Sequence, residues 1–72
     1  MIIYRVRHPI VAARQTARRR VTTEVLPVGT RLELACEPRL SGVIQALWKG
    51  EVVRVFATDL LTRADPIRPK DL

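Results

Sequence analysis

The chain has 72 residues, of which 47% are hydrophobic and 28% charged, and its formal net charge is +6 at pH 7. This length allows one small domain, and the apolar share excludes a compositionally disordered chain. A single cysteine excludes an internal disulfide, no cluster of metal ligands is visible, and the longest apolar stretch is far short of the ~20 residues that a membrane-spanning helix needs. We therefore expect a cytoplasmic protein without a cofactor, a metal or a membrane contact.

The N-terminal third begins with a predicted strand. Residues 2–8 alternate between apolar and basic side chains, which indicates a half-buried strand, and Pro9 ends it because proline cannot donate to a ladder. Residues 9–20 are rich in alanine and arginine, which favour helices. A helix here would bury only Ile10 and two alanines, so we predict a basic loop or a short helix at 9–20.

Two further strands are predicted in the middle of the chain. Residues 21–26 are rich in β-branched side chains, and a turn with proline and glycine follows them. Residues 30–36 then alternate, with Leu32, Leu34 and Cys36 on the inward face. The pattern predicts Cys36 as a small core residue rather than a nucleophile.

The clearest local signal is a hairpin. Two apolar runs, 43–48 and 51–57, are separated by Lys49 and Gly50, and a two-residue connection ending in glycine favours a primed turn. With that turn, the residue numbers of two paired positions add up to 99, so Gln45 lies opposite Arg54.

The end of the chain carries a weaker signal. A single helical turn is predicted near 58–62, with Thr58 or Asp59 as its cap. Prolines near the C-terminus indicate an exposed end. We therefore expect one domain over 1–67, followed by an exposed tail over 68–72.

These elements together predict an all-β fold, a small five-stranded antiparallel barrel with an additional N-terminal strand. The order of signals over residues 23–67 resembles that of SH3-like barrels. Residues 29–34 correspond to the first barrel strand, the hairpin turns at Lys49 and Gly50, and the run 53–56 leads into the helical turn.

The last of these runs, Val-Arg-Val-Phe, is also similar to a strand of the plasmid-type, trimethoprim-resistant dihydrofolate reductases. That family has Val-Gln-Ile-Tyr there, and those side chains line a pore in a tetramer. This chain has Arg54, Val55 and Phe56 at the corresponding positions, without the amide and the phenol. The resemblance therefore carries no reductase activity, and we expect neither an enzyme nor a small-molecule substrate.

The charge is strongly segregated along the chain. Residues 1–23 hold six arginines and no acid, whereas residues 24–72 hold seven bases and seven acids. Arginine suits planar contacts with phosphate or carboxylate groups. We therefore predict a binding module whose N-terminal segment contacts the backbone of nucleic acid, or another polyanion such as an acidic protein. The predicted contact residues are Arg5, Arg7, Arg14, Arg18, Arg19 and Arg20.

The hairpin supports an alternative function without a nucleic-acid role. One face carries Ile44, Ala46, Trp48, Val53 and Val55, with Glu51 at the tip, and apart from Glu51 this apolar face is predicted to form the core. The opposite face is also mostly apolar and is predicted as an interface of a protein-interaction module or of a homo-oligomer, a dimer or larger. Its residues are Val43, Gln45, Leu47, Val52, Arg54 and Phe56. Gln45 and Arg54 can equally be an ordinary cross-strand pair on an outer sheet.

Overall fold

Within residues 2–16 and 18–68, seven antiparallel strands form one sheet, accompanied by a single short helix. The computed structural model describes residues 2–16 and 18–68. In chain order, the elements are β1 (Ile2–Val6), β2 (Ile10–Gln15), β3 (Val21–Leu26), β4 (Arg31–Leu34), β5 (Val43–Trp48), β6 (Glu51–Phe56), α1 (Ala57–Arg63) and β7 (Ala64–Ile67).

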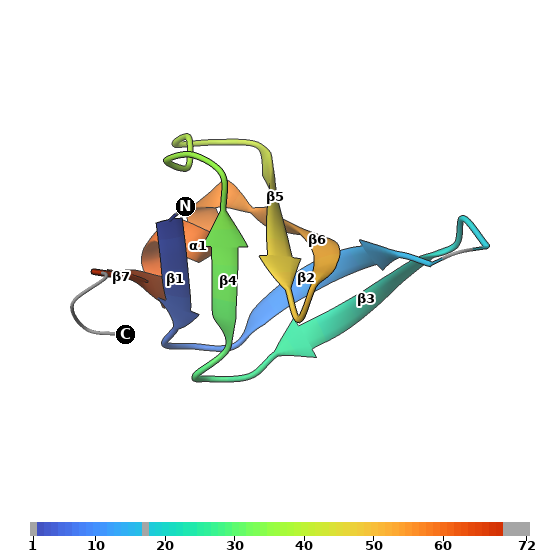
Figure 1. The fold of residues 1–72 in the computed structure, drawn as a ribbon, viewed down its shortest axis with the longest axis horizontal. Helices are drawn as coiled ribbons and strands as arrows, with labels where there is room; N and C mark the ends of the chain where they lie inside the picture. Colours follow the sequence, from blue (N-terminus) through green and yellow to red (C-terminus); the bar gives the residue numbers. More distant parts are fainter. Residues whose placement is uncertain (1, 17, 69–72) are drawn as a thin grey trace.

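The strand order is β3-β2-β6-β5-β4-β1-β7, so β3 and β7 are the two edges of the sheet. The all-β prediction is confirmed at this level, but the sheet is not closed into a barrel. Figure 1 shows why: β2 and β3 form a long hairpin that projects away from the body, while β7 lies at the opposite side of the molecule. The two edges therefore do not meet.

Of the segment predicted as a basic loop or short helix at 9–20, residues 10–15 are instead the strand β2, whereas Thr16 and Arg18–Arg20 do lie in a basic loop. It pairs with β3 from Ile10↔Leu26 to Gln15↔Val21, and with β6 at Ala12↔Val55 and Ala13↔Arg54. A strand held between two neighbours forms ladder hydrogen bonds on both sides, and this tertiary context outweighs the helix propensity of alanine and arginine.

The central hairpin confirms the predicted pairing. β5 and β6 pair from Val43↔Phe56 to Trp48↔Glu51, with Gln45 opposite Arg54. Lys49 and Gly50 both have positive φ, at 52° and 79°. Positive φ at both loop residues is what a type I′ turn requires, and this turn fixes the register.

The helix and the last strand differ from the sequence-based expectation. α1 spans seven residues and follows β6 directly, so Phe56 is the N-cap and no side chain caps the helix. Thr58 and Asp59, the predicted caps, lie inside its first turn. β7 pairs with β1 instead of belonging to an exposed end, and Pro66 is tolerated there because β7 is an edge strand. Of the predicted tail, Arg68 is exposed and 69–72 lie outside the described residues.

One face of the sheet and α1 enclose the core. The core residues alternate along the strands and are joined by one helical leucine: Tyr4, Val6, Ile10, Ala12, Leu26, Leu32, Leu34, Ala46, Val53, Val55, Leu60 and Ala64. Ile44 and Trp48 pack against this cluster, as predicted for their face of the hairpin. Cys36 is exposed, contrary to the prediction, because β4 ends at Leu34 and the alternation ends with it.

Two adjacent leucines of α1 provide a test of this core. Leu60 is fully buried, whereas Leu61 is 38% exposed. We expect Leu60→Ala to lower the free energy of unfolding by about 3 kcal/mol, because it removes buried methyl groups and leaves a cavity. Leu61→Ala has the same change in helix propensity and should cost less than about 1 kcal/mol. Equal losses in urea unfolding experiments would contradict this placement of the helix.

Candidate functional site

The six arginines that the sequence brings together are divided among three places in the structure. Arg5 lies on β1 between Arg31 on β4 and Asp65 on β7. Arg7 follows β1; its guanidinium lies 3.8 Å from the carboxylate of Asp65 and donates a hydrogen bond of 2.7 Å to the carbonyl of Thr62. Arg5 and Arg7 therefore lie on the β1–β7 side of the sheet, where the acidic Asp65 is next to basic side chains.

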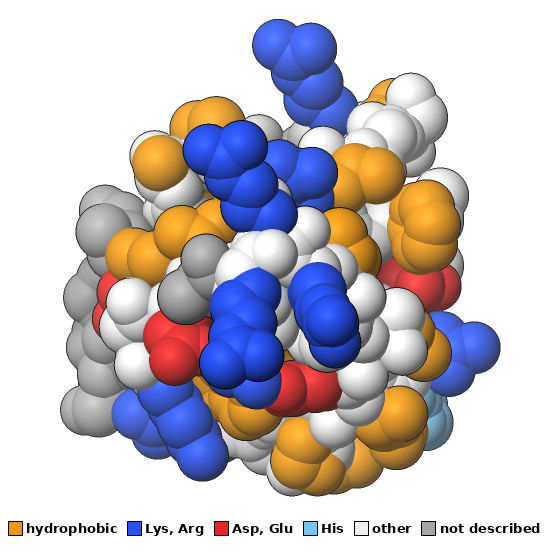
Figure 2. All heavy atoms as spheres, turned by 90° about the vertical axis from the view of Figure 1, so that its right-hand side faces the viewer, with side chains coloured by type: hydrophobic (Ala, Val, Ile, Leu, Met, Phe, Trp, Pro, Cys, Tyr) orange, Lys and Arg blue, Asp and Glu red, His pale blue; other side chains and the backbone are white. Residues whose placement is uncertain are grey.

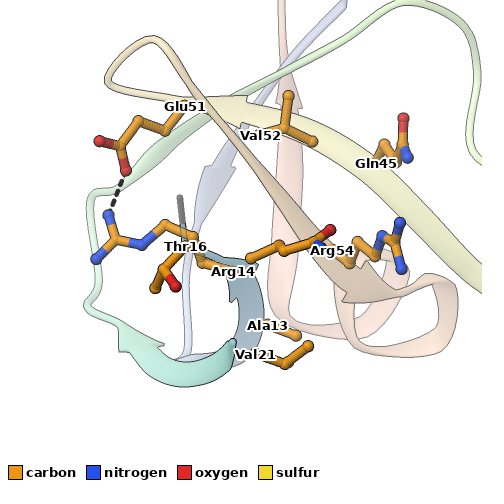
Figure 3. A pocket seen from close by; sticks show the side chains of 9 residues that line it. Ala13, Arg14, Thr16, Val21, Gln45, Glu51, Val52 and Arg54 are labelled. Atoms are coloured by element: carbon orange, nitrogen blue, oxygen red, sulfur yellow. Dashed lines mark hydrogen bonds and ion pairs between the residues drawn. The ribbon is translucent and has the colours of Figure 1, made fainter. Parts of the chain in front are cut away.

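Arg14 is held by two carboxylates. One nitrogen of its guanidinium donates to Glu24 on β3 and the other to Glu51 on β6, and Figure 3 shows the second of these contacts. The Arg14 side chain is 32% exposed. Because two negative charges already face its positive charge, Arg14 ties the β2–β3 hairpin to β6 and has little capacity left for a phosphate.

The remaining three arginines form the tip of the projecting hairpin. Arg18, Arg19 and Arg20 follow one another in the turn between β2 and β3, and all three are exposed. Thr16 closes this turn: its N–H donates to the carbonyl of Arg20 at 2.8 Å, and its carbonyl accepts from Arg19 at 2.9 Å. No carboxylate of the described residues forms an ion pair with these arginines. Figure 2 views the molecule from this end and shows basic side chains across the face, with fewer acidic ones.

The second predicted site, the face of the sheet away from the core, is open to solvent. Val43, Val52 and Phe56 are between 51% and 59% exposed. Gln45 and Arg54 are also exposed, and Leu47 is partly so. In the part of the chain that the structure describes, β1 and β2 take places within the sheet and cover none of these side chains. We call this surface the outer face.

The outer face extends further than the hairpin β5–β6, and sequence reasoning missed this extension. Ala13 on β2 lies beside Arg54, and exposed valines continue the surface onto the projecting hairpin: Val11, Val21 and Val25. Alternation along β2, with Ile10 and Ala12 inward and Val11 and Ala13 outward, could have predicted this extension. The alanines and arginines of the same segment favour a helix and made the alternation hard to recognise.

A hollow of about 830 Å³ lies on this surface, between the two hairpins. Val21 from β3 and Val52 from β6 are among the residues that line it, and Gln45 and Arg54 lie side by side on its wall (Figure 3). It is a broad, open depression lined by apolar, polar and charged side chains, among them Arg14, Glu51 and Arg54. An open depression of this kind does not enclose a small molecule as typical ligand cavities do.

The side chains most often used in catalysis and metal binding are scattered over the described part of the chain. The single histidine, cysteine and serine are all exposed and lie apart in sequence at His8, Cys36 and Ser41. Among residues 2–16 and 18–68, no three His, Cys, Asp or Glu side chains are grouped as metal ligands, and no helix is long and apolar enough to cross a membrane. Burial and the nearby charge of Glu37 raise the pKa of Tyr4.

Arg14 and the tip arginines should respond differently to substitution. Arg14→Ala removes both ion pairs between the β2–β3 hairpin and its surroundings and leaves Glu24 and Glu51 facing the same gap. We expect it to lower the free energy of unfolding by about 1 kcal/mol, with a smaller loss at high salt, because the pairs are partly exposed. Arg18→Ala at the solvated tip should leave stability unchanged in the same urea titration. A larger loss for Arg18→Ala would contradict the assigned roles.

The chain was compared with models of protein families, with curated proteins and with solved structures, and no match was found.

Proposed function

We propose that the protein is a non-enzymatic binding module that contacts nucleic acid, or another polyanion, through Arg18, Arg19 and Arg20. The observation that carries this proposal is their position: three consecutive exposed arginines form the tip of a two-stranded hairpin that projects from the body (Figure 1). The principal dimensions of the molecule are 38 × 23 × 22 Å, and the hairpin lies along the long one.

The shape of the hairpin suits a nucleic-acid duplex. The major groove of B-DNA is about 12 Å wide and admits a two-stranded β-ribbon. Arginines at the end of such a ribbon reach phosphates on the walls of the groove, where each guanidinium forms charge-assisted hydrogen bonds. The tip, at Thr16 and Arg18–Arg20, offers no aromatic ring for base stacking. Binding should therefore depend on the phosphate backbone and vary little with base sequence.

The salt dependence of binding tests this mechanism. Three phosphate contacts predict that the logarithm of the association constant for duplex DNA falls against the logarithm of the salt concentration with a slope of about −2.7. Replacing the three tip arginines by glutamine should remove most of this slope and most of the affinity in a fluorescence anisotropy titration. Each single replacement should reduce the slope by about 0.9.

A matched control separates the tip from the net charge. Replacement of Arg5, Arg31 and Arg68 by glutamine removes the same charge at exposed positions outside the hairpin. We expect this variant to retain the slope and most of the affinity. Equal weakening by both triple variants would mean that the whole surface, rather than the hairpin tip, attracts the polyanion.

The outer face supports a second candidate function, the docking of a protein segment that carries an acidic group. Val52 and Phe56 are more than half exposed, and the guanidinium of Arg54 lies among them without an ion-pair partner in the described residues. A carboxylate seated on Arg54 would be shielded from water by these apolar neighbours. This combination of a central arginine and an apolar surround is typical of the centre of protein interfaces.

This second function requires that the outer face contribute nothing to the core. Arg54→Ala should therefore change the free energy of unfolding by less than about 0.5 kcal/mol. Trp48→Ala, on the opposite face of the same hairpin, should cost about 2 kcal/mol because Trp48 packs against the core. Urea unfolding measures both. If Arg54→Ala were the destabilising variant, the outer face would be part of the folded core and could not be a docking surface.

A further inference from the structure

The edge strand β3 leaves one row of backbone hydrogen-bonding groups open. Among the strands of the described residues, β2 is the only one that pairs with β3. The Thr16 N–H donates to the Arg20 carbonyl, so these two residues form a hydrogen-bonded pair at the start of the ladder. Hydrogen-bonded and non-hydrogen-bonded pairs alternate along an antiparallel ladder. The N–H and C=O groups of Val21, Thr23 and Val25 therefore point away from β2, toward the open edge.

This edge lacks the protection that the other edge has. β7 has only four residues, and one of them is Pro66. β3 has six residues and no proline, and the side chains of Val21 and Val25 are 69% and 64% exposed. A long edge strand of β-branched residues is a template on which another strand can pair.

The side chains along this edge make it complementary to itself. The three residues with open backbone groups are also those whose side chains lie on the outer face, and they read Val, Thr, Val from Val21 to Val25. This order is the same in both directions. When two such strands are placed antiparallel about a two-fold axis at Thr23, Val21 of each copy faces Val25 of the other.

We propose that two copies of the protein associate by antiparallel pairing of their β3 strands, with Thr23 on the two-fold axis. In this register, Thr23 exchanges both backbone hydrogen bonds with Thr23 of the second copy. The two flanking Val21–Val25 pairs do the same. The cross-strand side-chain pairs are then valine with valine and threonine with threonine, which are favourable neighbours in sheets.

Neighbouring registers are less favourable. An axis at Val25 would place Thr23 opposite Pro27, which has no N–H to donate. An axis at Val21 would bring the tip arginines of one copy, Arg18–Arg20, close to those of the other copy, and like charges repel. Only the axis at Thr23 uses every open group of the edge.

This arrangement also sets the distance between the two basic tips. In this register, Arg20 of one copy faces Leu26 of the second copy. Leu26 lies six residues along β3 from the second copy's own Arg20. At about 3.3 Å per residue, the two tips are roughly 20 Å apart along the joined strands. The dimer therefore presents two arginine clusters to one polyanion, but its formation does not require the polyanion, and mass measurements test it separately.

Sedimentation velocity of the full chain without nucleic acid tests the dimer. The monomer mass is 8.2 kDa, so pairing should double it to about 16.4 kDa at high micromolar concentration. Thr23→Lys and Thr23→Glu each place two like charges opposite one another on the axis, and each should raise the dimer dissociation constant at least about tenfold. Because residue 23 faces itself only in this register, mixing the two variants should restore a species of dimer mass.

Two controls complete the experiment. Thr58→Lys adds the same charge at an exposed position of α1, away from the edge, and should remain dimeric. Circular dichroism should show that the Thr23 variants are folded. In hydrogen exchange, the amides of Val21, Thr23 and Val25 should be protected in the wild type and exposed in Thr23→Lys, whereas that of Thr22 stays protected in both. A monomeric wild type, or a dimer that the Thr23 variants do not weaken, would overturn the proposal.

Discussion

The structure depends on the pairing of β2 with strands on both of its sides. At Ala12 and Ala13, β2 is held between β3 and β6. Ile10 and Ala12 are thereby placed in the core, where they are almost fully buried. Beyond Ala13 the ladder with β6 ends while the ladder with β3 continues to Gln15. One strand therefore belongs to the body of the sheet at its beginning and to the projecting hairpin at its end.

The place where β2 leaves the body is also where Arg14 is found. Arg14 is on the same face of β2 as the buried Ile10 and Ala12, so its side chain would lie in the core if β6 continued beside it. An unpaired charge buried there would lower the stability of the fold. At the margin of the core, water and two carboxylates solvate it instead. Each of these ion pairs contributes little free energy, but Glu24 and Glu51 come from different strands. Together they define the direction in which the hairpin leaves the sheet.

The separation of roles among the arginines follows from this geometry. A run of positive charge in the sequence becomes three sites with different surroundings: Arg5 and Arg7 near Asp65, Arg14 between two glutamates, and Arg18–Arg20 in open solvent. Charge that is compensated within the chain stabilises the fold slightly. The charge of the tip is not compensated by any ion pair among the described residues, so its electrostatic field extends into the solvent around the projecting hairpin.

The sequence by itself determined the elements whose causes are local. The hairpin β5–β6 was predicted with its register because Lys49–Gly50 specify the turn and alternation specifies the faces. The strand β3 was predicted with the same bounds, and the arginines of the tip and the outer-face residues of β5 and β6 were both identified as candidates. Each of these signals lies within a few consecutive residues.

Only the tertiary structure decided the rest, because the causes lie in distant parts of the chain. β2 is a strand because β3 and β6 satisfy its backbone, although its residues favour a helix. β7 exists because β1 offers an edge that accepts a strand containing proline. The sheet stays open because β3 follows β2 into the projecting hairpin. Local sequence patterns specify turns and faces, but the choice of neighbouring strands, and hence which arginines remain free, depends on contacts between residues far apart in the chain.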